Sequence, residues 1–85
     1  MGFSSEQEVA AAIRESIESS IPDSKAEVTA AGGGHYALVV TAAAFEGQKV
    51  LAKQRMVLSS IKHLMGDDSA PVHAIDSIKT LLPGA

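Results

Sequence analysis

The chain is 85 residues long, so residues 1–85 are expected to form one small domain. Its apolar content of 46% is in the globular range, and it has no cysteine that could form a disulfide or bind a metal as thiolate. The net charge of −3 excludes a whole-molecule field that attracts polyanions. No membrane-spanning run and no signal-peptide pattern is present, so we expect a cytoplasmic protein, with the mature form of an organellar protein as the alternative.

Residues 5–21 are predicted to form an amphipathic helix. Four apolar residues recur at every fourth position on one face: Val9, Ile13, Ile17 and Ile21. Ser5 or Ser4 is a suitable N-cap, and Glu8 completes a capping box with Ser5. Pro22 ends the helix.

Two strands are predicted next, over residues 25–31 and 35–45. The first alternates small apolar with polar residues, and the second has a nearly continuous apolar middle. The run Gly32-Gly33-Gly34 between them has the backbone freedom of a turn, so the strands should pair as an antiparallel hairpin. The run does not lead into a helix, which makes a turn more probable than a phosphate-binding loop.

A second helix is predicted from Lys49 or Val50 to Met65, with Gly66 at its C-cap, and a third strand over residues 72–81. The third strand follows a helical crossover, so it can lie parallel to a strand of the hairpin. The expected fold class is therefore α+β: a single small domain in the order helix, strand, strand, helix, strand, with a three-stranded mixed sheet and helices on one face.

No catalytic arrangement is visible, so no enzymatic activity is expected. Basic side chains gather at the second helix, where Lys49 and Lys53 lie four residues apart on one face and Arg55 follows. A solvated face is the more common explanation of such a group. If it binds phosphates, binding should be weak and sensitive to salt, and the segment has no aromatic residue to stack on bases.

The three histidines are candidate metal ligands. His73 begins the last strand, His35 begins the second strand beside the glycine run, and His63 lies where it can interact with the dipole of a helix C-terminus. A single histidine is more often structural or simply exposed. One imidazole cannot hold zinc or an iron–sulfur cluster, so a site at His73 needs His35, His63 or another protein.

Five short motifs, in this order and spacing, resemble the BolA-like family, IbaG-type proteins included: His35-Tyr36, Phe45-Glu46-Gly47, Lys53-Gln54-Arg55-Met56-Val57, His73-Ala74 and Lys79-Thr80-Leu81. The resemblance implies a fold like the type II KH domain, with a helix-turn-helix-like element around residues 46–65. It implies two functions. One is a non-enzymatic adaptor that pairs with a monothiol glutaredoxin and glutathione and shares a two-iron two-sulfur cluster in iron–sulfur and iron homeostasis. The other is a nucleic-acid-binding transcriptional regulator, active in the stress response.

The resemblance also assigns residues. His73 aligns with the family's histidine ligand. The family's loop ligand, a cysteine or histidine, is replaced by the glycine run, and His35 is the nearest substitute. The protein alone should hold no cluster. Lys49, Lys53 and Arg55 would contact nucleic acid or a partner, although Gln54 replaces the middle histidine of the family's basic motif. Weak DNA binding and a homodimer stay open, and no membrane partner is expected.

Overall fold

The computed structural model of the chain describes residue 3, residues 5–66 and residues 70–84. Its elements follow in the order α1 (Glu6–Ser20), β1 (Lys25–Gly32), β2 (His35–Thr41), the 3-10 helix η1 (Ala43–Phe45), α2 (Val50–Ser60), the 3-10 helix η2 (Lys62–Leu64) and β3 (Ala74–Leu81). The predicted α+β order is confirmed. Within the described residues, no helix is long and apolar enough to cross a membrane.

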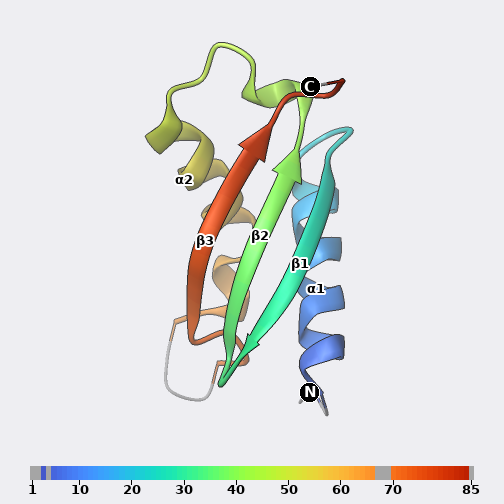
Figure 1. Ribbon diagram of the computed structural model, residues 1–85, viewed down its shortest axis with the longest axis vertical. Helices are drawn as coiled ribbons and strands as arrows, with labels where there is room; N and C mark the ends of the chain where they lie inside the picture. Colours follow the sequence, from blue (N-terminus) through green and yellow to red (C-terminus); the bar gives the residue numbers. More distant parts are fainter. Residues whose placement is uncertain (1–2, 4, 67–69, 85) are drawn as a thin grey trace.

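The three strands form one mixed sheet in the order β1-β2-β3, with β1 antiparallel and β3 parallel to the central strand β2. Both α-helices lie behind this sheet, on the same face (Figure 1). No helix within the described residues covers the opposite face (Figure 1). That face of the sheet is therefore not covered by a described helix, and its side chains are the more exposed ones.

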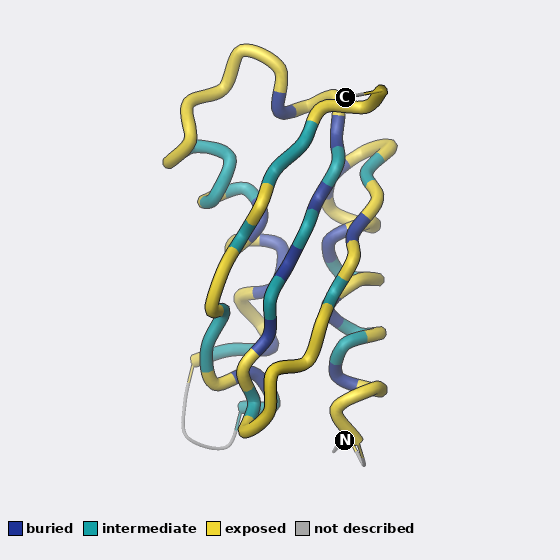
Figure 2. Tube along the Cα trace, viewed as in Figure 1, coloured by how far each residue is buried: buried dark blue, intermediate teal, exposed yellow. Residues whose placement is uncertain are grey.

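The core lies between the sheet and the helices. Along β2, buried and half-buried residues alternate (Figure 2). The buried ones are Tyr36, Leu38 and Val40, which belong to the core. They pack against Val9, Ile13 and Ile17 of α1 and against Val57 and Ile61 at the C-terminal end of α2. The apolar stripe predicted for the first helix is therefore its buried face.

Helix α1 begins and ends close to its predicted limits. Ser5 is its N-cap in an extended conformation, and the side-chain oxygen accepts a hydrogen bond of 3.2 Å from the backbone N–H of Glu8. At the other end, the N–H of Ile21 donates to the carbonyl oxygen of Ile17 at 2.9 Å. Of the two predicted N-caps, the structure therefore uses Ser5.

The prediction of a strand over residues 35–45 is wrong at its C-terminal end. Strand β2 ends at Thr41, and the N–H of the next residue, Ala42, donates to the carbonyl oxygen of Leu81 at 3.0 Å. The chain then turns through η1, which buries Phe45. A strand continued to residue 45 would run past the end of the sheet, whereas the 3-10 turn returns the aromatic ring to the core.

The prediction of a single helix up to Met65 is also wrong. Helix α2 ends at Ser60, whose hydroxyl donates to the carbonyl oxygen of Val57 at 2.6 Å, and Ile61 leaves the helical conformation at φ −117° and ψ 10°. The following turn, η2, lets both Ile61 and Leu64 enter the core. Gly66 has a φ of +136° and follows η2, so it is not the C-cap of α2.

Candidate functional site

Strand pairing brings His35 and His73 to the same end of the sheet. His35, the first residue of β2, is paired with Ala74, the first residue of β3. The backbone N–H groups of His73 and Ala74 both donate to the carbonyl oxygen of Gly34, at 2.9 and 3.3 Å. The two histidines named from the sequence therefore flank one glycine of the β1–β2 turn.

Gly34 supports the side chain of His73. Its φ of +81° lies in the left-handed region that favours glycine. A Cβ atom added to Gly34 would lie 3.0 Å from Cγ of His73 and closer still to Cδ2. The imidazole therefore packs directly over the glycine Cα, in space that any other side chain would occupy.

The ring of His73 is available for binding. The residue is exposed, and its imidazole makes no hydrogen bond to the described part of the protein. Gly34 thus limits where the ring can lie without using either ring nitrogen. Both ring nitrogens of His73 are therefore open to another molecule.

His35 is held differently. Its Nδ1 lies 2.8 Å from Oδ1 of Asp76, and the two side chains are 47% and 48% exposed. The other ring nitrogen, Nε2, has no hydrogen-bond partner within residues 5–66 and 70–84. The sequence reasoning missed Asp76.

A bulge in β3 places Asp76. The register pairs Tyr36 with Ile75 and then Ala37 with Ser77, so Asp76 is an extra residue in β3. The sequence carries a signal of this bulge, because two consecutive polar residues interrupt the alternation between Ile75 and Ile78.

The described side chains can supply ligands to a metal group shared with another molecule, but they do not form a complete metal site by themselves. No group of three or more His, Asp or Glu side chains that could hold a metal ion is found among the described residues. The candidate donors are therefore the imidazole nitrogens of His35 and His73, and stable zinc or iron–sulfur sites use about four ligands. Imidazole is an established ligand of two-iron two-sulfur clusters, so the residues fit such a group if another molecule supplies the remaining ligands.

His63 does not join this pair. Its Nε2 lies 3.3 Å from the hydroxyl oxygen of Ser16 in α1, and the same hydroxyl donates to the carbonyl oxygen of Ser60 at 2.8 Å. His63 is on η2 rather than at the end of a long helix. Its contacts join η2 to α1, which is a structural role.

The three predicted basic contact residues do not form one patch. Lys49 is the N-cap of α2, and Lys53 follows one helical turn later, with its N–H bonded to the Lys49 carbonyl oxygen at 3.0 Å. Arg55 comes two residues after Lys53, or about 200° further around the helix axis. The structure therefore keeps Lys49 and Lys53 together and turns Arg55 to another face.

Arg55 lies on an exposed face of α2 that carries two leucines beside it and Ser59 at the i+4 position. Leu51 and Leu58 are its neighbours at the i−4 and i+3 positions, and Leu51 is 57% exposed. We call Leu51, Arg55 and Leu58 the outer face of α2. A hollow of about 400 Å³ continues this face toward η2 and is lined by Leu58, Ser59, Lys62, Met65 and Gly66. The sequence could have shown this face, because Leu51, Arg55 and Leu58 have helical spacing.

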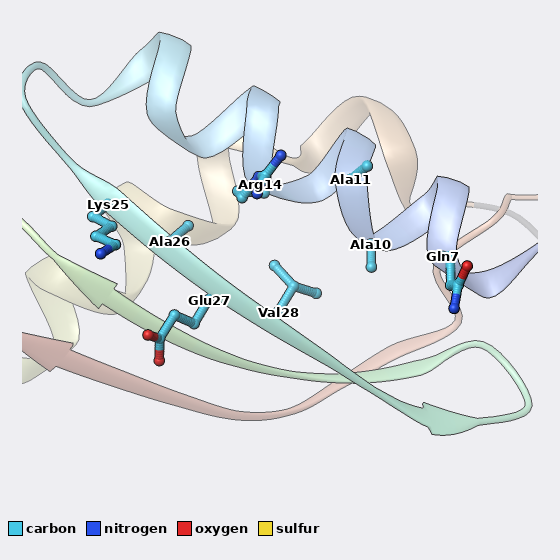
Figure 3. Close-up of a pocket in the computed structure, with 8 residues that line it drawn as sticks. All are labelled: Gln7, Ala10, Ala11, Arg14, Lys25, Ala26, Glu27 and Val28. Atoms are coloured by element: carbon cyan, nitrogen blue, oxygen red, sulfur yellow. The ribbon is translucent and has the colours of Figure 1, made fainter.

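A separate groove of about 440 Å³ lies between α1 and β1. Figure 3 shows Ala10 and Val28 facing each other across it, with Arg14 and Glu27 near its edges. None of the residues predicted for a site lines this groove. It is therefore not part of the candidate site at His35 and His73.

Comparison with known proteins gives a consistent result. The family model described as BolA-like protein matches residues 6–84. The structure is similar to a bolA protein homologue from Coxiella burnetii, with 30% identity, a TM-score of 0.68, and coverage of 98% of this chain and 94% of that chain. It is also similar to a bol-like protein from Babesia bovis, with 26% identity, a TM-score of 0.70, and coverage of 99% and 92%.

The solution structure of BolA1 from Mus musculus matches with 27% identity and a TM-score of 0.70, over 98% of this chain and 72% of that chain. Among proteins with curated descriptions, none matches the chain. The fold, the order of its motifs and the family match agree, and the chain belongs to the BolA-like family.

Proposed function

We propose that this protein is a non-enzymatic adaptor. It pairs with a monothiol glutaredoxin and contributes His73 to a two-iron two-sulfur cluster held between the two proteins, in iron–sulfur and iron homeostasis. The observation that supports this most is the imidazole of His73, held against Gly34 and free of hydrogen bonds to the described residues. His35, at the same end of the sheet, is the candidate for a second ligand.

The chemistry of the chain requires a partner for this function. Without cysteine, the protein has no thiolate of its own, so thiolates would come from the glutaredoxin and glutathione. When bound, the cluster supplies electron-transfer chemistry, with a reduction potential that imidazole ligands raise relative to thiolates. The role of this chain is to hold a neutral imidazole at a fixed place beside the sheet.

The outer face of α2 is the proposed docking surface for the glutaredoxin. Exposed apolar side chains around an arginine are typical of the centre of a protein–protein interface. Leu51 and Leu58 are 57% and 38% exposed, and exposed apolar side chains that lie together can mark an interaction surface. The hollow beside Leu58 gives this face a concave end that a partner side chain can fill.

A reconstitution experiment tests the proposal. Cluster-loaded monothiol glutaredoxin is mixed with the wild-type protein, and visible absorption and circular dichroism are recorded. We expect the wild type to change both spectra and His73→Ala to lose most of this change. His63→Ala is the matched control and should behave as wild type, because His63 contacts Ser16 away from the pair. If His73→Ala gives the wild-type change, His73 is not a ligand.

The alternative proposal is a KH-like nucleic-acid-binding regulator. It is favoured by the shared face of Lys49 and Lys53 at the start of α2. The separation of Arg55 from these lysines and the net charge of −3 both favour the adaptor instead. A titration with DNA and with RNA at low and moderate salt distinguishes the two proposals. Undetectable binding near physiological salt would exclude the regulator.

A further inference from the structure

We infer that Asp76 is a positioning residue for His35. Its carboxylate selects the tautomer of His35 that carries the proton on Nδ1, and so presents the lone pair of Nε2 as a ligand. The inference rests on the proposed function in one respect only, namely that the ligand position belongs to the shared cluster. The choice of tautomer is a property of the isolated protein.

The bulge in β3 has a consequence for both faces of the sheet. Ile75 and Ile78 are both packed against the core, although a regular strand would point residues three apart to opposite faces. One extra residue between them, Asp76, restores the core position of Ile78 opposite Leu38. The bulge therefore keeps the core register and at the same time brings the Asp76 carboxylate to within 2.8 Å of His35 Nδ1.

The contact determines where the proton of a neutral His35 lies. A neutral imidazole donates from one nitrogen and accepts at the other, whereas an ionised carboxylate only accepts. At 2.8 Å from the Asp76 oxygen, Nδ1 must be the donor, so the lone pair is on Nε2. Histidines that bind metals commonly donate their second ring N–H to a carboxylate in this way, and this partner sets the orientation of the ring.

The two histidines depend on different contacts. At Gly34 an added Cβ would clash with the His73 ring, whereas at Gly33 it would only touch Cδ2 of His35, at 3.9 Å. The glycine run therefore restricts His73 closely and His35 loosely. Because both partners of the His35–Asp76 pair are about half exposed, the pair should add little to stability. Its main effect is then on the tautomer and orientation of His35.

The first test uses the isolated protein. Long-range ¹⁵N–¹H NMR at mildly alkaline pH, where imidazoles are neutral, assigns the tautomer of each histidine. We expect the Nδ1–H form for His35 in the wild type and in Asp76→Asn, whose amide oxygen still accepts a hydrogen bond. Asp76→Ala should shift His35 to the Nε2–H form that free histidine prefers. His63 and His73 serve as internal controls and should not change. An Nε2–H form in the wild type, or no shift in Asp76→Ala, would overturn the inference.

The second test separates this inference from the proposed function. The affinity of the shared complex for its cluster should fall on the order of ten- to a hundredfold in Asp76→Ala, as is typical when the carboxylate partner of a ligand histidine is lost. The loss should be much smaller in Asp76→Asn. Ser77→Ala, the next residue of the bulge, is the matched control. If His73→Ala abolishes the spectral change and Asp76→Ala leaves retention as in wild type, the proposed function stands and the positioning role fails. If the wild type itself does not affect the cluster, the proposed function fails, and the NMR result still decides the role of Asp76.

Discussion

His73 donates its backbone N–H to the carbonyl oxygen of Gly34 at 2.9 Å, and its imidazole lies over the Cα of the same glycine. Position 34 therefore has two independent reasons to be glycine. One is its positive φ of +81°, and the other is the space taken by the ring. Gly33 and Gly34 form the predicted turn, whereas Gly32 is the last residue of β1. Gly34 also supports the candidate ligand.

Replacing Gly34 by alanine should change both the stability and the place of the His73 ring. The left-handed backbone costs a residue with a Cβ about 1–2 kcal/mol, and the added methyl group must displace the imidazole. Gly33→Ala is the control, because it has a φ of +62° and no contact with His73. In urea unfolding, the backbone strain should lower the free energy of unfolding by a similar amount in both variants. Gly34→Ala should show a further decrease from the displaced imidazole. Only Gly34→Ala should move the NMR signals of the His73 ring. Equal shifts in the two variants would contradict this packing.

A core substitution tests the burial of Ile61, the C-cap of α2. Ile61 is fully buried where the helix gives way to η2, so Ile61→Ala should lower the free energy of unfolding by about 2–5 kcal/mol. Leu82→Ala changes an exposed leucine and should stay within about 0.5 kcal/mol of wild type. Chemical unfolding of the two variants provides the comparison. A loss within about 0.5 kcal/mol for Ile61→Ala would contradict the burial of this side chain.

The outer face of α2 can be tested by one polar substitution. Leu51→Ser should leave the unfolding free energy nearly unchanged, because the side chain is 57% exposed, and it should weaken binding to the glutaredoxin about fivefold or more if Leu51 lies in the interface. Glu27→Ser, on the exposed side of β1, is the control and should bind as wild type. Isothermal titration calorimetry measures both. Unchanged binding by Leu51→Ser would place the interface elsewhere.

The accuracy of the sequence predictions depended on whether local or distant contacts set each boundary. Helix α1 was predicted within one residue at each end, because its limits are set locally by the cap at Ser5 and by Pro22. The predicted C-terminal ends of β2 and α2 were wrong, because each end depends on contacts with distant residues in the folded core. Leu81 pairs with the residue after β2, and the burial of Phe45 and Ile61 turns the chain.

The same distinction applies to the candidate site. Residue type and family resemblance were sufficient to name His35 and His73, but their meeting at Gly34 depends on the parallel pairing of β2 with β3. Asp76 was missed because a bulge is defined only when the register of both strands is known. The placement of Arg55 and Lys53 on different faces of α2 was also missed, although helical periodicity alone predicts it.

Tyr36 gives the protein a predictable response to alkaline pH. Burial raises the pKa of Tyr36 above its usual 10.0, and the negative charge of Glu6 raises it further. The unfolded chain therefore loses the phenolic proton at a lower pH than the folded protein. Because the unfolded state then binds fewer protons than the folded state, stability falls as the pH rises above about 10. The contribution of Tyr36 is fully present below that pH and is lost as the pH passes the pKa of the folded state.

Two measurements check this response. Tyr36 is the single tyrosine of the chain, so the ultraviolet absorption of tyrosinate reports its titration alone, and its midpoint should lie above 10.0. Tyr36→Phe should lose less stability at alkaline pH than the wild type. The difference in the free energy of unfolding between the two proteins is the measured quantity, because the effects of other groups that titrate in this range cancel in it. Glu6→Gln should lower the midpoint without returning it to 10.0, because burial is the larger cause. A midpoint at or below 10.0 in the folded wild type would mean that the phenol is solvated, and Tyr36 would then not be the buried residue of β2 that faces α1.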